Sequence, residues 1–191
     1  MHTAKPVALL FCLLTIVVSC SVHIRLPVPI RSSFQSGTNF YKAAFAYKWH
    51  QRDSAAVRQV FNGNIPSFLE RLVPIHVRVV DSVTNRTIRA TYFVTPDYLS
   101  IGTDEDWARI NITPMAAQKI ADSFHCFLPT RKIVDDIYKA ATVKLEPVPM
   151  YALRDSTPTM YHHHLIIEGQ RKGQKGLIAG IQKDVVISGK I

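Results

Sequence analysis

A lone cysteine and a run of histidines are the residues of this chain with the clearest capacity for chemistry. Cys126 lies shortly before a predicted helix, and the positive end of a helix lowers the pKa of a nearby thiol. A thiolate oriented by an imidazole is the nucleophile of cysteine hydrolases. His125 is adjacent in an extended segment and would point to the opposite face, so His162 and His164 are the better bases. This pattern predicts a cysteine hydrolase or amidase that acts on cell-wall peptides.

Cys126 also has a purely structural explanation. Phe124, Phe127 and Leu128 surround it with apolar side chains, and free cysteine is among the most buried residue types. The alternative to a nucleophile is therefore an inert thiol in the core.

The three consecutive histidines, His162 to His164, raise the question of a metal site. In an extended strand, successive side chains alternate faces, so at most His162 and His164 would share one ion. No Cys, Asp or Glu set at ligand spacing accompanies them, and the loop GTDEDW lacks the spaced ligand pattern of a calcium loop. We therefore expect no metal and no cofactor, and surface or packed histidines.

Thr130, Arg131 and Lys132 begin a predicted helix with the wrong charges for its N-terminus. Free N–H groups and about half a positive charge lie at that end, so cations in the first turn are mildly destabilising. Backbone donors, helix dipole and two cations together predict a pocket for an acidic ligand or polymer. The alternative is a solvated helix face, with Arg131 paired to Asp135 and Lys132 to Asp136 at i,i+4 spacing.

The elements that must position these residues mix helix and strand patterns. Asn62-Gly63-Asn64 is a helix stop, and Thr113 before Pro114 is an N-cap. The segment 161–171 fits either a helix or a strand. The predicted elements are helices over 43–64, 65–74, 114–124 and 131–141, a hairpin over 75–95, and a final strand that ends at 191. They indicate a single α+β domain, with a mixed or antiparallel sheet packed by about four helices.

The N-terminus predicts where the protein is located. Residues 7–18 form an apolar run that is too short to span a bilayer and follows a single lysine, which is typical of a signal peptide. Val17-Val18-Ser19-Cys20 resembles a bacterial lipobox, which implies that acyl chains on Cys20 anchor the protein to a membrane. An ordinary secretory signal is the alternative. We expect a signal peptide over 1–19, a lipidated tether over 20–42 and the domain over 43–191, exported to the face of the bacterial cell membrane or outer membrane.

A strongly basic balance predicts acidic partners. The net charge is +9, and it becomes +8 once Lys5 leaves with the signal, with 22 basic against 14 acidic residues. Anionic lipid head groups or an anionic cell-envelope polymer fit this charge, and export argues against nucleic acid.

Several segments of the chain carry a resemblance. Distinctive among them are LPTRK and VDDIY within residues 113–149, and KDVVIS at 183–188; with GNIPSFLERLVP and ATYFVTPDYLSIGTDED they span most of 62–191. This set resembles a family of exported bacterial proteins of unknown function. The family implies a chain that continues beyond Ile191, so we expect either an edge strand there or the front part of a longer domain. Members often carry histidine where this chain has Ile181 or Gln182, which would remove a catalytic partner.

These observations favour a membrane-anchored envelope lipoprotein that binds an acidic ligand or polymer at a basic helix N-terminus. The alternative is the cysteine hydrolase with Cys126 as nucleophile. A purely structural surface protein is the third class.

Overall fold

Capping side chains determine where four of the helices begin. The hydroxyls of Ser36, Thr113, Thr130 and Ser156 each accept a hydrogen bond from the backbone N–H three residues later. Such caps satisfy amides that have no partner inside the helix. The N-cap predicted at Thr113 is confirmed.

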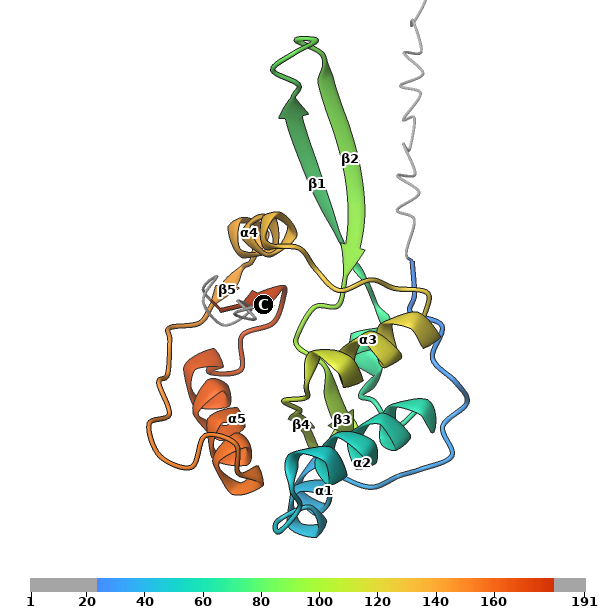
Figure 1. Cartoon of the computed structure of the whole chain (residues 1–191), viewed down its shortest axis with the longest axis vertical. Coiled ribbons are helices and arrows are strands. Elements are labelled where there is room, and N and C mark those ends of the chain that lie inside the picture. Colours follow the sequence, from blue (N-terminus) through green and yellow to red (C-terminus); the bar gives the residue numbers. More distant parts are fainter. Residues whose placement is uncertain (1–23, 181–191) are drawn as a thin grey trace, which may run out of the picture.

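The computed structural model describes residues 24–180, which form a single α+β domain (Figure 1). The predicted fold class is therefore confirmed. In chain order the elements are α1 (Gly37–Ala43), α2 (Trp49–Phe61), the 3-10 helix η1 (Ser67–Glu70), β1 (Val73–Val80), β2 (Thr87–Val94), β3 (Ser100–Gly102), β4 (Trp107–Arg109), α3 (Pro114–Ser123), α4 (Arg131–Ala140), β5 (Val143–Lys144), α5 (Thr157–Arg171) and β6 (Ile178–Ala179).

The described strands pair as three two-stranded sheets. β1 and β2 form the predicted antiparallel hairpin, β3 and β4 form a second antiparallel pair, and β5 and β6 pair in parallel. The hairpin projects away from the rest of the domain, with α4 beside its base (Figure 1). Each sheet is too small to be stable alone, so at least part of it must pack against the rest of the domain.

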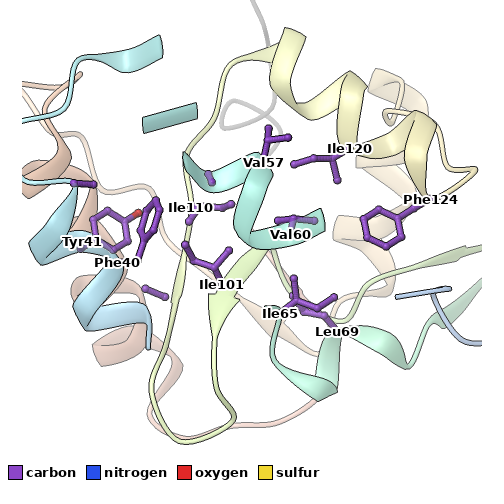
Figure 2. Packing of buried hydrophobic residues seen from close by; sticks show 13 residues of the cluster. Phe40, Tyr41, Val57, Val60, Ile65, Leu69, Ile101, Ile110, Ile120 and Phe124 are labelled. Atoms are coloured by element: carbon purple, nitrogen blue, oxygen red, sulfur yellow. The ribbon is translucent and has the colours of Figure 1, made fainter. Parts of the chain in front are cut away.

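The largest hydrophobic cluster joins α1, α2, η1, β3, β4 and α3. Phe40, Val60, Leu69, Ile101 and Phe124 are among its buried side chains, and Figure 2 shows them converging from these elements. Two smaller clusters lie beyond it. One joins the base of the hairpin to α4 and β6, and the other joins β5 and β6 to α5.

The segment expected to be a tether is folded in its last part. Residues 37–42 belong to α1, and Phe40 and Tyr41 are buried in the main cluster. Leu26 and Val28 also pack against that cluster. The domain therefore includes residues before 43. Prolines and serines interrupt this segment, but its apolar side chains contact the main hydrophobic cluster.

The helix expected over 43–64 corresponds to α2 alone and begins later than predicted. α1 ends at Ala43 and α2 begins at Trp49, where the backbone N–H of Lys48 donates to the side-chain oxygen of Gln51 at 3.0 Å. α2 ends at Phe61 with Asn62 as its C-cap, so the predicted stop at Asn62-Gly63-Asn64 is confirmed. The second predicted helix is reduced to the single turn of η1.

The acidic loop between β3 and β4 has a structural role. Both carboxylate oxygens of Asp104 accept hydrogen bonds from Ser67, at the start of η1, with distances of 2.6 and 2.7 Å. Asp106 accepts from the backbone N–H and the hydroxyl of Thr38 in α1 at 2.9 and 3.0 Å. These bonds to neutral donors lower the pKa of Asp106, against the opposing effect of burial. The β3–β4 loop therefore holds η1 through Asp104 and α1 through Asp106.

Among the described residues, no helix combines the length and the apolar character needed to cross a bilayer. The signal peptide, Cys20, Ile181 and Gln182 lie outside the described residues.

Candidate functional site

The start of α4 lies where the sequence predicted it, and Thr130 caps it. Thr130 Oγ1 accepts a hydrogen bond from the N–H of Ile133 at 3.4 Å. Lys132 folds back onto the carboxylate of Asp136, one turn later. Arg131 is exposed and makes no ion pair within residues 24–180, so the predicted pair with Asp135 is absent. One of the two cations at this helix end is therefore neutralised by its neighbour, and the other is available to an anion.

A groove of about 560 Å³ runs beside this helix end. Pro129, Ile133, Val134 and Ile137 form one wall, and all four belong to α4 or to the residue before its cap. The base of the hairpin, the segment 97–99, the loop 125–127, the end of β6 and the first described residues complete the lining. Most of the lining is apolar, so this groove suits a hydrophobic chain rather than a polar one.

A tyrosine connects the groove to the ion pair on α4. Tyr92 lines the groove, and its hydroxyl lies 3.5 Å from the carbonyl oxygen of Ile133. Burial and the neighbouring Asp136 carboxylate raise the pKa of Tyr92 to about 12. Tyr92 is therefore a neutral hydrogen-bond donor at physiological pH, and Asp136 stays engaged with Tyr92 and Lys132.

Cys126 lines the same groove, and its thiol is not activated. The residue is exposed, so the alternative of an inert core thiol is wrong. Its Sγ donates to the carbonyl oxygen of Phe124 at 3.4 Å, and partial burial raises the pKa of the thiol. A cysteine nucleophile needs the opposite shift.

The two histidines proposed as bases lie on α5, away from the groove lining. His162 is exposed and His164 is buried. Of the two structures that segment 161–171 fits, it forms the helix, as part of α5, so the extended geometry considered for the histidines does not apply. Side chains two positions apart on a helix point to roughly opposite sides. Neither histidine lines the groove that contains Cys126. The structure therefore does not bring the proposed nucleophile and bases together.

His164 belongs instead to a buried ionic cluster that the sequence analysis did not anticipate. Arg109, on β4, donates from Nε and Nη2 to the two oxygens of Asp97 at 2.8 and 2.6 Å. Its Nη1 donates to Glu168 on α5 at 2.7 Å, and its guanidinium lies over the ring of Trp107 at 5.0 Å. Each of the three guanidinium nitrogens has a carboxylate partner. This cluster clamps α5 against β4 and the segment before β3, and it uses the Arg109 guanidinium for structure.

One signal for this cluster was present in the sequence. Arg109 lies between the apolar residues Ala108 and Ile110, and a single charge between apolar residues usually has a partner when it is buried. Its partners Asp97 and Glu168 are 12 and 59 residues away in sequence, so the spacing gave no means of finding them.

The tautomer of His164 follows from its contact with β4. The backbone N–H of Arg109 donates to His164 Nδ1 at 3.3 Å, so this nitrogen carries no proton. Burial, together with the nearby Arg109 charge, lowers the pKa of His164 to about 4, despite the opposing carboxylates of Glu168 and Asp106. His164 is therefore a neutral imidazole at physiological pH.

Comparison of the chain with protein-family models, with curated proteins and with solved structures finds no match. The site is therefore interpreted from its geometry alone. Within residues 24–180, no group of three or more His, Cys, Asp or Glu side chains is placed to hold a metal ion.

The depressed pKa of His164 predicts a pH-dependent stability. Above about pH 6.5 the imidazole is neutral in both the folded and the unfolded chain, so it adds no slope. Between about pH 6.5 and about pH 4 the unfolded chain binds a proton that the folded chain does not, so the free energy of unfolding falls as the pH falls. Urea unfolding at a series of pH values should show this slope. In His164→Asn the slope should be lost, whereas in His162→Asn, the exposed control, it should remain; an unchanged slope in His164→Asn would contradict the assignment.

Proposed function

We propose that this chain is an exported bacterial envelope lipoprotein, anchored through acylated Cys20, that binds an acidic amphiphile such as a fatty acid or lipid. The apolar part of the ligand would occupy the groove beside α4. Its acidic head would bind at the α4 N-terminus, near Thr130 and Arg131. This proposal also retains the family resemblance and the location at the bacterial cell membrane or outer membrane.

One observation carries the proposal: an apolar groove borders a helix N-terminus whose first residue, Arg131, makes no ion pair among residues 24–180. Pro129 and Ile133, which line the groove, flank Thr130 and Arg131. Free amides and the helix dipole favour an anion at this position, and Arg131 adds a flexible charge-assisted donor. An anionic polymer fits less well, because it would leave the apolar groove empty.

The cysteine hydrolase has less support. Cys126 lines the groove, yet the raised pKa of its thiol disfavours the thiolate, and His162 and His164 lie on a different element. Binding of an apolar chain in the groove requires no chemistry from Cys126.

The proposal predicts that Arg131 and Lys132 differ in their effect on binding. Arg131→Gln should weaken the binding of a fluorescent long-chain fatty acid by about tenfold, since a hydrogen bond to a charged group contributes about 1.5–3 kcal/mol. Lys132→Gln is the matched control, and it should change binding much less, because Lys132 already pairs with Asp136. The methyl ester of the same acid should bind equally to the parent and to Arg131→Gln.

A second variant tests the groove separately from the charge. Cys126→Trp adds bulk to the groove at an exposed position, so the fold should survive while the affinity for both acid and ester falls. If neither probe binds the parent chain, or if Cys126→Trp binds both as well as the parent does, the proposal is wrong. If only the acidic head is misassigned, Arg131→Gln and Lys132→Gln will be indistinguishable.

A further inference from the structure

The outer half of the β1–β2 hairpin extends beyond all three hydrophobic clusters. At its base, Ile75 is buried against α4 and β6. From Arg78 outward to the turn, and back along β2 to Thr91, every residue but Asp81 is exposed. Figure 1 shows this arm standing clear of the helices. An isolated two-stranded hairpin has little stability in water, so an exposed arm of this length suggests that the arm binds a partner or a surface.

One face of the arm is apolar from its base as far as Val79 and Ile88. The register places Ile75 opposite Tyr92, Val77 opposite Ala90 and Val79 opposite Ile88. Residues two apart on a strand share a face, so these three pairs form one continuous stripe. The stripe is buried at the base and becomes exposed at its outer end, where 46% of Val79 and 56% of Ile88 are accessible. Val83, in the turn, is 90% exposed.

The other face of the arm carries positive charge. The register places Arg78 directly opposite Arg89, and like charges in this position destabilise a hairpin. Arg86 lies at the turn. The one acidic residue between 76 and 91 is Asp81, whose carboxylate accepts from Val83 N–H at 2.9 Å and from the Thr84 hydroxyl at 2.7 Å. These bonds lower the pKa of Asp81 and use its carboxylate to shape the turn, so it does not pair with the arginines in the described structure.

An arm with an apolar end and cations behind it matches the boundary of an anionic bilayer. Five residue positions separate Arg78 from Val83 at the tip, a rise of at most about 16 Å at about 3.3 Å per residue. An interfacial segment buries its apolar face about 5–10 Å into the head-group boundary, which would leave the Arg78–Arg89 pair close enough for its long side chains to reach the lipid phosphates. A soluble polyanion would meet the arginines but would leave the valines exposed to water.

The start of the described chain lies beside the same hairpin. The N–H of Leu72, the residue before β1, donates to the carbonyl oxygen of Ile24 at 3.1 Å, and Arg25 forms a β-bridge with Arg71. The hairpin base and residue 24 therefore lie at the same place on the domain (Figure 1). Cys20, the predicted lipidation residue, is four residues earlier in the sequence.

We propose that the outer half of the β1–β2 hairpin, residues 78–89, docks on an anionic membrane surface, with Val79, Val83 and Ile88 at the apolar boundary and three arginines on lipid phosphates. This surface is distinct from the groove beside α4. It requires no acyl chain on Cys20, so it can be tested without one.

The test is sedimentation with vesicles, using the chain from residue 20 onward with Cys20→Ser. Vesicles of phosphatidylglycerol mixed with phosphatidylcholine should bind the chain, and pure phosphatidylcholine vesicles should bind it much less. The double variant Arg78→Gln/Arg89→Gln should lose about fivefold in partitioning for each arginine, because a cation near an anionic surface contributes about 1 kcal/mol. Removing the like-charge pair should also stabilise the hairpin, so unfolding would not explain the loss.

Matched controls exist elsewhere on the surface. Arg58→Gln/Lys119→Gln removes two exposed cations from α2 and α3, and Met115→Asp places a charge at a side chain that is 70% exposed. Both should partition like the parent, whereas Val83→Asp should reduce partitioning by about tenfold. Equal partitioning of the hairpin and control variants would overturn the proposal. So would a dimer that the hairpin variants dissociate without any change in vesicle binding, since the arm would then be an interface between two copies.

Discussion

Replacing Arg109 by methionine is expected to lower the free energy of unfolding by about 3–5 kcal/mol, enough to unfold a marginal domain. Arg109 and Asp97 are only 3% and 4% exposed, and Arg109 supplies two short hydrogen bonds to that carboxylate. Methionine fills much of the volume but leaves the buried Asp97 charge without a cation, with the Tyr98 backbone N–H still donating to it at 2.7 Å. The loss therefore comes from the uncompensated Asp97 rather than from the missing pair itself. Urea unfolding, monitored through tryptophan fluorescence, measures it directly because Trp107 lies against Arg109.

A double variant separates these two contributions. Arg109→Met/Asp97→Asn removes the orphaned charge, so it should recover a substantial part of the stability lost in Arg109→Met. Arg154→Met is the control, because Arg154 is exposed, and it should stay within about 0.5 kcal/mol of the parent. If the single and double variants were equally unstable, the unpaired carboxylate would not be the cause, and the clamp on α5 would need another explanation.

Replacing Gly102 by alanine is expected to cost at least about 3 kcal/mol. Gly102 ends β3 with a φ of +123°, a conformation that side chains rarely adopt, and such strain costs about 1–3 kcal/mol. A Cβ here would also overlap the carbonyl oxygen of Asp106 and lie 2.7 Å from Trp107 Cα. Both are backbone groups of the facing strand and loop, so no side chain can move to make room, and overpacking adds about 1–3 kcal/mol.

A glycine in α5 provides the matched control for Gly102. A Cβ at Gly169 meets nothing within 4 Å, so Gly169→Ala should raise the free energy of unfolding by about 0.5–1 kcal/mol through helix propensity. Thermal unfolding of both variants should show opposite shifts. If Gly102→Ala melted at the parent temperature, the close approach of β3 to the 103–107 loop would be wrong.

Local patterns predicted the elements whose signals lie within a few residues. The hairpin over 75–95 was readable because alternating residues surround a turn, and α3 was readable because Thr113 and Pro114 mark its first turn. The sequence analysis did not predict α1, because residues 20–42 show no sustained helical period, and it began the next helix too early, because residues 44–48 have helical composition although they only connect α1 to α2. Residues 161–171 were ambiguous because their apolar positions fit more than one period, and contact with β4 selects the helix.

In the candidate site, too, local features were predicted from the sequence and features that depend on distant contacts were not. The sequence located the start of α4 and its two cations, because an N-cap and a charge pattern are local. It did not distinguish Arg131 from Lys132, since each had a carboxylate four residues later; only the folded structure shows that Lys132 pairs and Arg131 does not. The groove could not be predicted from the sequence, because its walls come from six separate parts of the chain.

The sequence by itself determined the α+β class, the hairpin and the basic start of α4, since these depend on interactions between neighbours along the chain. It also carries the predictions of export and of a lipid anchor at Cys20. Only the tertiary structure brings Arg109, Asp97, Glu168 and His164 into one buried cluster. Only the tertiary structure places Cys126 in the lining of a groove that His164 does not line. The physical reason is that burial and charge pairing depend on which distant segments come into contact, and no spacing in the sequence encodes that contact.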